Sequence, residues 1–485
     1  MKTKILSVGI TLLTLCSILL APATFAAGSD DFSQEIEGTL DERMAHFNVP
    51  GVSIALIEGG EIAYAKSFGY SDKATQTPMT PDTLYQVASV SKGLTAWGIM
   101  RLVDEGKIGL DDPVEKYLTR WHIPPSPYDA NGVTVRRLLN HTAGIALEGY
   151  GAGVPVGEPL PSLEASLLGD NRGCGAVRLV REPGKAMMYS GGGYTILQLL
   201  VEEVTGQVFA DYMKKNILNP LGMTDSTFVW DEQVQSRLSR AYGTYYNTIP
   251  NQTYIEDAAG GLYSSLNDMA RYAQVILDGS AVLSQESFDL LFQGDSYGLG
   301  YGLIDFPGSE RFIFGGGTRM GWQSDFVVFP EDGSGIVILS NANGGSILNL
   351  EIIDHWVEWK TGSSWPGAEL FFYQYPILLG IAIALGIACT IYAITLSLQF
   401  RRKRRVFLLQ SRRNKILRIF WIVLVLAVTI VWWLYCFTPT FDPQIRMLWA
   451  PEPFLYVSIL GTVLASAMIT GSLFPTQKSC AGISA

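Results

Sequence analysis

The chain has 485 residues, a formal net charge of −10 and a mean hydropathy of +0.21, and only 16% of its residues are charged. It is too apolar for a disordered protein and too polar for a polytopic transporter. The negative charge lies in residues 27–370, whereas residues 371–485 carry an excess of Lys and Arg. Because an acidic body repels a phosphate backbone, we expect no nucleic-acid partner.

Residues 1–26 are typical of a secretory signal peptide, with an uncleaved anchor helix as the alternative. Lys2 and Lys4 precede an apolar run, and small residues follow it up to Ala26. Residues 27–370 contain a single cysteine, Cys174, so no disulfide can form within them. A large exported domain without disulfides fits a bacterial envelope better than a eukaryotic secretory product.

The hydrophobic pattern of residues 27–365 predicts an α+β domain. Helical spacing over 31–47 is followed by a β-hairpin, residues 52–57 and 61–68, that turns at Glu58-Gly59-Gly60. Helices are then expected at 93–105, 135–139, 194–205 and 265–277. Apolar, β-branched strands are expected at 311–314, 323–329 and 335–340, before a closing helix at 347–359. We expect one antiparallel sheet flanked by helices, with a mostly helical lobe within about 85–280.

The last quarter of the chain is expected to enter a membrane. Three apolar segments are long enough to span a bilayer, which takes ~20 residues; they are residues 371–400, 419–437 and 454–474. The intervening segment 401–418 is rich in Arg and Lys, which places it in the cytoplasm by the positive-inside rule. This topology predicts a multi-pass protein of the bacterial cytoplasmic membrane, with an extracytoplasmic body and a cytoplasmic C-terminus.

Chemistry is suggested first by Ser89 and Lys92, which stand three apart at the start of an apolar helix. On a helix, this spacing places both side chains on one face. A serine hydroxyl needs a nearby base to act as a nucleophile, and a partly buried lysine can supply one. By itself the pair more often marks a helix N-cap followed by a solvated lysine.

Six segments in a fixed order add context to this pair. They are Tyr85–Lys92, Leu138–Gly144, Tyr189–Tyr194, Asn219–Ser226, Ala258–Tyr263 and Gly315–Trp322. Over residues 31–360 this series resembles the serine hydrolases of the penicillin-binding protein and class C β-lactamase superfamily. The similarity is to the β-lactamase-related branch that includes D-alanyl-D-alanine carboxypeptidases and esterases.

The resemblance implies roles for individual residues. Ser89 matches the acyl-accepting nucleophile, Lys92 its proton acceptor, and Tyr189 the tyrosine that passes the proton to the leaving group. The backbone N–H groups of Ser89 and Thr318 match the oxyanion hole, with Gly317 before Thr318 in the third motif. No metal and no organic cofactor is implied.

Two positions depart from the family pattern. Gly191 stands where a Tyr-x-Asn motif has asparagine, and Gly315 stands where the third motif has lysine or histidine. In the family that cation helps to hold a substrate carboxylate, so its absence points to ester or amide substrates without one. Arg319 could substitute for it electrostatically.

Three further sequence features could be taken for catalytic motifs or residues, but we assign them no catalytic role. Lys360-Thr361-Gly362 spells a third motif but follows the last helix of the body, so we interpret it as a linker. Gly294–Gly298 has the spacing of a nucleophile elbow but lacks the following helix, which favours a turn. For His141, packing or capping is favoured over catalysis.

Together these patterns predict a membrane-anchored serine hydrolase that forms an acyl-enzyme on Ser89. The expected substrates are small molecules or cell-wall groups, namely D-alanyl amides of peptidoglycan peptides or D-alanyl esters of teichoic acids. A β-lactamase or a general esterase is the enzymatic alternative. A non-catalytic penicillin-binding-like receptor or scaffold is the alternative from another class.

Overall fold

The computed structural model describes residues 32–146, 153–169, 175–279, 281–305, 311–366, 368–402, 419–420, 422–427, 429–430 and 452–473. Contacts divide the chain into two compact units, one formed by Ser29–Trp365 and the other containing Pro366–Ala485. Each unit is described by itself. The predicted signal segment, Cys174 and residues 403–418 of the basic loop lie outside the described residues.

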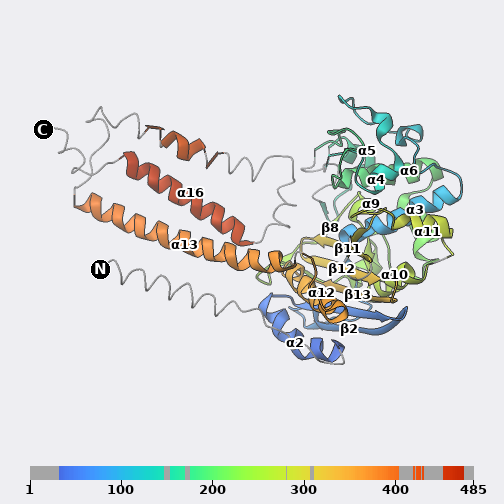
Figure 1. Ribbon diagram of the computed structural model, residues 1–485, viewed down its shortest axis with the longest axis horizontal. Coiled ribbons are helices and arrows are strands. Elements are labelled where there is room, and N and C mark those ends of the chain that lie inside the picture. The colour runs from blue at the N-terminus through green and yellow to red at the C-terminus, as the bar shows by residue number, and fades with distance from the viewer. Residues whose placement is uncertain are drawn as a thin grey trace. The chain divides into compact units, whose positions relative to one another are not determined.

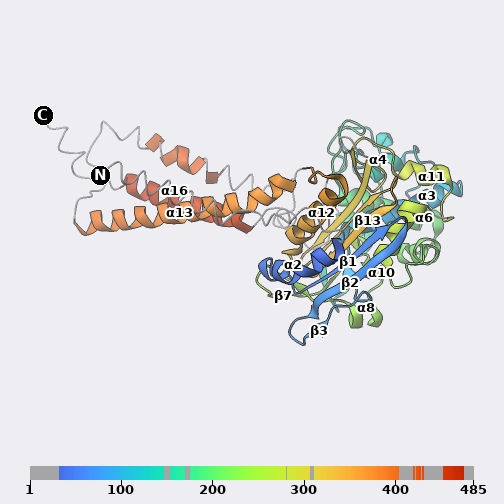
Figure 2. The same cartoon turned by 60° about the horizontal axis from the view of Figure 1, so that its bottom comes forward.

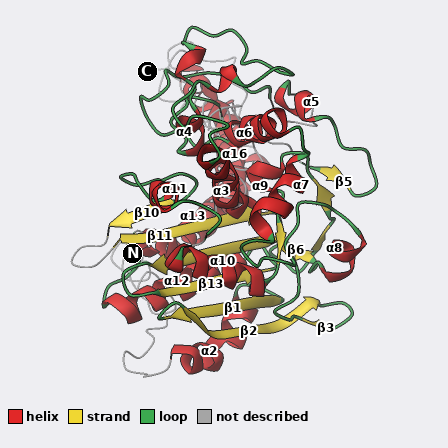
Figure 3. Cartoon of the chain, turned by 90° about the vertical axis from the view of Figure 1, so that its right-hand side faces the viewer, coloured by secondary structure: helices red, strands yellow, loops and turns green. Residues whose placement is uncertain are grey.

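A seven-stranded antiparallel sheet forms the centre of the first unit (Figure 1). Its strand order is β10-β11-β12-β13-β1-β2-β3 (Figure 3), so the early and late strands share one sheet as predicted. The first and last strands, β1 and β13, pair directly, with Ile54 opposite Ile338. The strands are β1 (Gly51–Glu58), β2 (Glu61–Asp72), β3 (Thr77–Pro78), β10 (Gly302–Asp305), β11 (Arg311–Arg319), β12 (Trp322–Phe329) and β13 (Ser334–Ser340). The predicted α+β class and its antiparallel sheet are confirmed.

Alternation along the central strands β1, β12 and β13 buries both faces of this sheet, whereas β2 is exposed or half-buried. On β1, Val52, Ile54 and Leu56 face a core shared with α2 (Phe32–His46) and α12 (Gly345–Thr361), whereas Ala55 and Ile57 face the larger core of the helical lobe. Figure 2 shows α12 and α2 on one side of the strands and α10 on the other. This double burial explains why β1 is a nearly continuous apolar run.

Helices and short strands fill the chain between β3 and β10. The helices are η1 (Ala88–Val90), α3 (Ser91–Asp104), η2 (Val114–Lys116), η3 (Ala130–Gly132), α4 (Val135–Leu139), α5 (Leu163–Leu167), α6 (Gly191–Thr205), α7 (Phe209–Met213), η4 (Lys214–Leu218), α8 (Glu232–Arg237), α9 (Asp257–Gly260), α10 (Leu266–Asp278) and α11 (Gln285–Leu291). The strands are β4 (Tyr85–Gln86), β5 (Val154–Pro155), β6 (Ala241–Tyr242), β7 (Thr248–Ile249), β8 (Gln252–Thr253) and β9 (Tyr263–Ser264). The sequence pattern misses the shorter of these, because a few residues carry no readable period.

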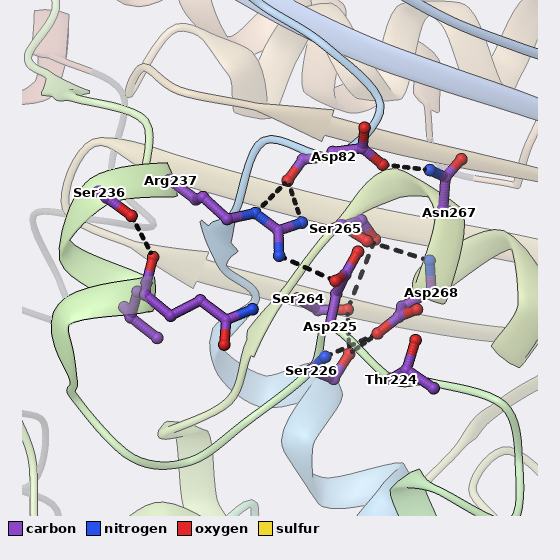
Figure 4. A network of polar contacts seen from close by, with 12 residues as sticks. Asp82, Thr224, Asp225, Ser226, Ser236, Arg237, Ser264, Ser265, Asn267 and Asp268 are labelled. Carbon is purple, nitrogen blue, oxygen red and sulfur yellow. Dashed lines mark hydrogen bonds and ion pairs between the residues drawn. The ribbon is translucent and has the colours of Figure 1, made fainter.

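The segment Asn219–Ser226, one of the six ordered segments, ends in residues that hydrogen-bond neighbouring elements together (Figure 4). Ser226 donates through both its N–H and its Oγ to Asp268 on α10, each over 2.7 Å, and its Oγ lies 2.9 Å from Ser264 Oγ. Arg237 joins Asp225 to the backbone carbonyl of Asp82. This network anchors β9, which pairs with β4 immediately before Ser89.

The second unit contains α13 (Ala368–Arg401) and α16 (Glu452–Leu473), which contact each other. Within the described residues, one helix, Ile377–Arg401, is long and apolar enough to cross a membrane. It lies in the first predicted span. The third predicted span corresponds to α16, and the second is described only in part. Three transmembrane helices and their orientation therefore stay predictions.

Candidate active site

Ser89 lies in a strained turn between β4 and α3. The preceding residue, Ala88, has a φ of 47°, a left-handed conformation that costs a residue with a Cβ about 1–3 kcal/mol. Its carbonyl accepts a hydrogen bond of 2.6 Å from Ser91 Oγ, which itself accepts one from the N–H of Leu262. The neighbouring chain thus fixes a turn that leaves the Ser89 side chain half-buried at the start of a helix.

Lys92 lies one helical turn further on and is only 2% exposed. Its Nζ donates to Ser89 Oγ over 3.0 Å and to the carbonyl of Ala259 on α9. Burial lowers the pKa of Lys92 below its ordinary value, and the positive charge of Arg319 lowers it further, while Tyr189 opposes the shift. A lysine in this state can accept a proton.

Tyr189 completes the contacts around the serine. It directly precedes the N-cap of α6, Ser190, and its OH donates to Ser89 Oγ over 2.9 Å. The ring of Tyr189 also lies 5.0 Å from Lys92 Nζ. The structure therefore brings together Ser89, Lys92 and Tyr189, although the tyrosine is 100 residues from the serine in sequence.

Strand β11 passes directly over the serine turn, and Gly317 makes this approach possible. A Cβ at Gly317 would lie 2.0 Å from the carbonyl oxygen of Val87 and 2.8 Å from the N–H nitrogen of Ser89. Only glycine fits so close to another backbone. Thr318, the next residue, directs its Oγ1 away into a 2.7 Å hydrogen bond with Gln323 Oε1. The oxyanion role of Ser89 and Thr318 stays a prediction.

Gly315, where the third motif has a cation, is covered by an aromatic ring. Its cross-strand partner is Phe326, and a Cβ at position 315 would lie 2.4 Å from Phe326 Cε1. Phe326 is 2% exposed and packs edge-on against Tyr272 and Tyr301. The absence of a cation at position 315 therefore follows from how the sheet packs, because the Phe326 ring occupies the space that a side chain would need. Gly191, the other departure, is buried as the first residue of α6.

Arg319 is a buried cation on the same strand. It is 6% exposed, its Nη2 donates to the carbonyl of Gly260 over 2.7 Å, and its guanidinium lies 3.5 Å from the centre of the Tyr254 ring. It is close enough to Lys92 to lower its pKa. Arg319 thus supplies positive charge to the site from a position two residues after Gly317.

Tyr297 is a neighbour of the site that sequence reasoning missed. It belongs to Gly294–Gly298, which forms a turn as predicted, and its ring lies 5.1 Å from that of His141. Burial raises the pKa of Tyr297 far above its ordinary value, and Tyr189 adds to the shift. No spacing in the sequence indicates this contact, since it depends on how the loop folds back.

The remaining matches fall elsewhere. Lys360 and Thr361 form the last turn of α12, and Gly362 ends it at a φ of 72°, so this segment is a helix end rather than the linker we expected. Lys360 pairs with Asp332, 3.2 Å away. Across the described part of the chain, no group of three or more His, Cys, Asp and Glu residues could hold a metal ion.

Comparison with known proteins now identifies this arrangement. Residues 36–350 match the family described as Beta-lactamase. The chain belongs to the β-lactamase family. It is thus a member of the superfamily of β-lactamase-like and penicillin-binding-protein-like serine hydrolases.

Three relatives show the breadth of the β-lactamase family. Protein flp of Staphylococcus aureus (strain N315) is 25% identical over 429 residues, which cover 84% of this chain and 82% of that protein. Penicillin-binding protein 4* of Bacillus subtilis (strain 168) is 27% identical over 335 residues, 62% of this chain and 70% of that protein. The octameric penicillin-binding protein homologue from Pyrococcus abyssi superposes with a TM-score of 0.60 at 30% identity, covering 71% of this chain and 81% of that one.

Proposed function

We propose that the protein is a membrane-anchored, extracytoplasmic serine hydrolase that acts on D-alanyl amide or ester groups of the cell envelope. The observation that supports it most is the pair of hydrogen bonds at the Ser89 hydroxyl, whose Oγ lies 3.0 Å from Lys92 Nζ and 2.9 Å from Tyr189 OH. A serine placed between a buried lysine and a tyrosine has a proton acceptor and a proton donor within reach.

The reaction would proceed in two acyl-transfer steps. Ser89 Oγ attacks the carbonyl carbon while neutral Lys92 takes the hydroxyl proton. The tetrahedral oxyanion lies against the backbone N–H groups of Ser89 and Thr318, where one such donor is typically worth about 10²–10³ in rate. Tyr189 then protonates the leaving alkoxide or amine and recovers a proton from Lys92, which leaves an ester on Ser89 and both side chains in their starting states. Water then attacks the ester by the reverse of these steps and releases the acid; another acceptor would release an ester or amide instead.

The substrate class follows from the third motif. Phe326 covers Gly315, so no side chain can extend a cation from that position toward a substrate carboxylate. We therefore favour D-alanyl esters of teichoic acids, or amides that present no carboxylate there, over β-lactams. Carboxypeptidase action on peptidoglycan peptides would need Arg319 to hold the carboxylate instead. A general esterase is the second candidate, favoured by the same glycine.

The location is part of the proposal. The apolar helix Ile377–Arg401, the predicted signal segment and the predicted basic loop 401–418 favour anchoring in the cytoplasmic membrane with the body outside. Two of the named relatives are bacterial proteins. An anchored body would reach the polymers at the outer face of that membrane.

The test is the intact mass of the full-length chain in detergent after incubation with a fluorophosphonate, with benzylpenicillin and with a D-alanyl ester probe. Ser89→Ala, folded to the same Tm, is the control. We expect a single fluorophosphonate adduct and a D-alanyl ester turned over through the same serine, both absent in the control.

Each other result has a defined meaning. Stable penicillin adduction together with cleavage of a D-Ala-D-Ala peptide would replace the ester reading by the carboxypeptidase reading. Fast turnover of penicillin would make the protein a β-lactamase. If no probe labels a folded wild-type chain, the catalytic proposal fails and a binding protein remains.

A further inference from the structure

His141 forms hydrogen bonds with the backbone of the residues on both sides of Tyr189. The residue follows α4 in a left-handed conformation with a φ of 60°. Its carbonyl accepts a hydrogen bond of 2.7 Å from the N–H of Met188, and its ring Nδ1 accepts one of 3.2 Å from the N–H of Ser190. The residues immediately before and after Tyr189 are therefore both tied to His141.

The imidazole also packs directly on the tyrosine. Its ring centre lies 4.3 Å from that of Tyr189, 5.2 Å from that of Tyr194 and 5.1 Å from that of Tyr297, and the residue is 2% exposed. Tyr194 is itself fixed by a 2.8 Å hydrogen bond from its OH to the carbonyl of Leu139. Enclosed by three rings, the imidazole has little freedom to rotate.

The hydrogen bond from Ser190 defines the protonation state of His141. Because a backbone N–H can only donate, Nδ1 carries a lone pair, and a neutral ring then carries its proton on Nε2. Burial lowers the pKa of His141 well below 6.5, and the charge of Lys92 adds to the shift, so the ring is neutral at physiological pH. Protonation would place a hydrogen on Nδ1 and break the bond to Ser190.

An imidazole here is unfavourable for packing alone. Nε2 is buried and, within the part of the chain that the structure describes, has no hydrogen-bond partner. Burying an unpaired polar group destabilises a fold, and a phenylalanine would fill the same space without that penalty. A phenylalanine, however, has no acceptor for the N–H of Ser190. The acceptor at Nδ1 is thus what distinguishes the histidine.

We propose that His141 is a positioning residue that holds the hydroxyl of Tyr189 on Ser89 through its neutral ring. Packing against the imidazole sets the plane of the tyrosine, and the two backbone hydrogen bonds set the path of residues 188–190. The inference rests on the proposed function, because it matters only if Tyr189 takes part in acyl transfer. His141 itself touches neither the serine nor the substrate.

Two substitutions separate the two contacts. His141→Phe keeps an aromatic ring against Tyr189 but leaves the N–H of Ser190 without an acceptor. His141→Asn keeps an acceptor near the place of Nδ1 but removes the ring. In the full-length chain, quench-flow acylation by an alkyl ester of D-alanine, whose alkoxide leaves only when it is protonated, gives the acylation rate constant and the non-covalent affinity separately. We expect both variants to lower the rate constant about 10- to 100-fold, with affinity unchanged, since a misplacement near 1 Å can cost that much.

The pH profile distinguishes positioning from general acid or base catalysis. If His141 is neutral and acts only through geometry, His141→Asn lowers the plateau of the rate without moving its acid limb. Val135→Ala, a buried change on α4, the helix that ends just before His141, controls for lost packing: it should lower the Tm and leave the rate constant as it is. An acid limb that moves in His141→Asn would mean that the imidazole itself titrates in the reaction and would overturn the inference.

A double-mutant cycle with Tyr189→Phe closes the test. We expect Tyr189→Phe to slow acylation and the addition of His141→Asn to slow it no further, because the histidine then has nothing left to position. If the two losses multiply, His141 acts independently of Tyr189 and the inference alone fails. If Tyr189→Phe leaves the rate unchanged, the role of the tyrosine in the proposed function fails, and the inference fails with it.

Discussion

Lys92 shows how a single buried side chain acquires its chemistry. Its Nζ donates to Ser89 Oγ and to the carbonyl of Ala259, neither of which carries a full negative charge. Burial is the largest influence on the pKa of Lys92, and it favours the neutral form. The positive charge of Arg319 acts in the same direction, so we expect the reactivity of Lys92 to depend on this second buried cation.

Changing Arg319 should move the pH dependence of acylation. The rate rises with pH until Lys92 has lost its proton, at a pKa below 10.5. Arg319→Gln removes a like charge, so Lys92 holds its proton more strongly and the acid limb shifts to higher pH. Arg319→Lys retains the charge and should leave the limb near its wild-type position. Acylation by p-nitrophenyl acetate between pH 5 and 10 measures this, and an unmoved limb in Arg319→Gln would contradict it.

Asp325 gives a stability effect at the residue scale. It accepts hydrogen bonds from Asn349 and Gln323, yet burial raises its pKa from 3.8 to about 6. Between these pH values the folded state binds more protons than the unfolded state, so stability is lost as pH rises from about 4 to about 6. Asparagine cannot ionise. Asp325→Asn should therefore gain roughly 1–3 kcal/mol relative to wild type on going from pH 4 to pH 7.5.

Urea unfolding at both pH values checks this prediction. The buried Oδ1 of Asn349 has no partner within the described residues. In Asp325→Asn it can accept a hydrogen bond from the new side-chain amide once the amide of Asn349 rotates by half a turn. A difference between variant and wild type that is the same at pH 4 and pH 7.5 would show that Asp325 ionises normally in the fold.

At the scale of elements, the site depends on how closely β11 approaches the turn before α3. The three consecutive glycines of β11 serve different contacts. Gly317 lies on the backbone of Val87 and Ser89, Gly315 lies under the ring of Phe326, and a Cβ at Gly316 would meet a carboxylate oxygen of Asp325. The strand is thus adapted to its neighbours on both faces of the sheet.

Gly317→Ala should damage the site more than the fold. The added Cβ meets backbone atoms that have little room to move, so we expect a loss of about 1–3 kcal/mol and a displaced Ser89. Acylation should fall about 100-fold. Gly38→Ala, in helix α2 with nothing within 4 Å, is the matched control and should gain about 0.5–1 kcal/mol at full activity. Equal effects of the two alanines on acylation would refute the close approach.

Gly315 and Phe326 should behave as a coupled pair. Gly315→Lys alone forces the Phe326 ring out of its packing with Tyr272 and Tyr301, so it should destabilise the protein. Phe326→Leu makes room, and the double variant should be more stable than the sum of the single changes by about 0.5–3 kcal/mol. Denaturant unfolding of the four proteins measures the coupling, and strict additivity would mean that the ring can move aside freely.

For the whole molecule, the boundary of the catalytic body is set by packing at its last residues. The ring of Trp365 packs against the rings of Phe312 and Phe314. The backbone N–H of Trp365 donates to Asp354 Oδ1 over 2.5 Å. Ser364 binds the same carboxylate oxygen. These contacts belong to the unit Ser29–Trp365. The body therefore ends after Trp365.

Truncation tests this boundary. A protein of residues 29–366 should fold without detergent and react with the fluorophosphonate as fast as the full-length chain. One that ends at residue 362 loses Trp365 and should melt lower, by about 1–2 °C for each kcal/mol of packing lost. Thermal unfolding compares the two. If both melt at the same temperature, Trp365 contributes nothing to the body and the boundary lies earlier.

Features that depend on local geometry and periodicity could be predicted from the residues alone. Alternating strands and amphipathic helices indicated the α+β class, and the i, i+3 spacing indicated that Ser89 and Lys92 share a helix face. The order of the six sequence segments also indicated that Gly315 occupies the position where the family pattern has a lysine or histidine. Such features can be predicted because a few adjacent residues fix them.

The contacts between distant groups could be seen only in the folded domain. It places Tyr189 on Ser89, the carbonyl of Ala259 on Lys92 and Phe326 over Gly315. It also turned His141 from an ordinary buried residue into the support of Tyr189, because its partners come from α6 and from the loop that carries Tyr297. These contacts join segments far apart in the chain. Close packing of the whole domain sets them, and no local pattern records them.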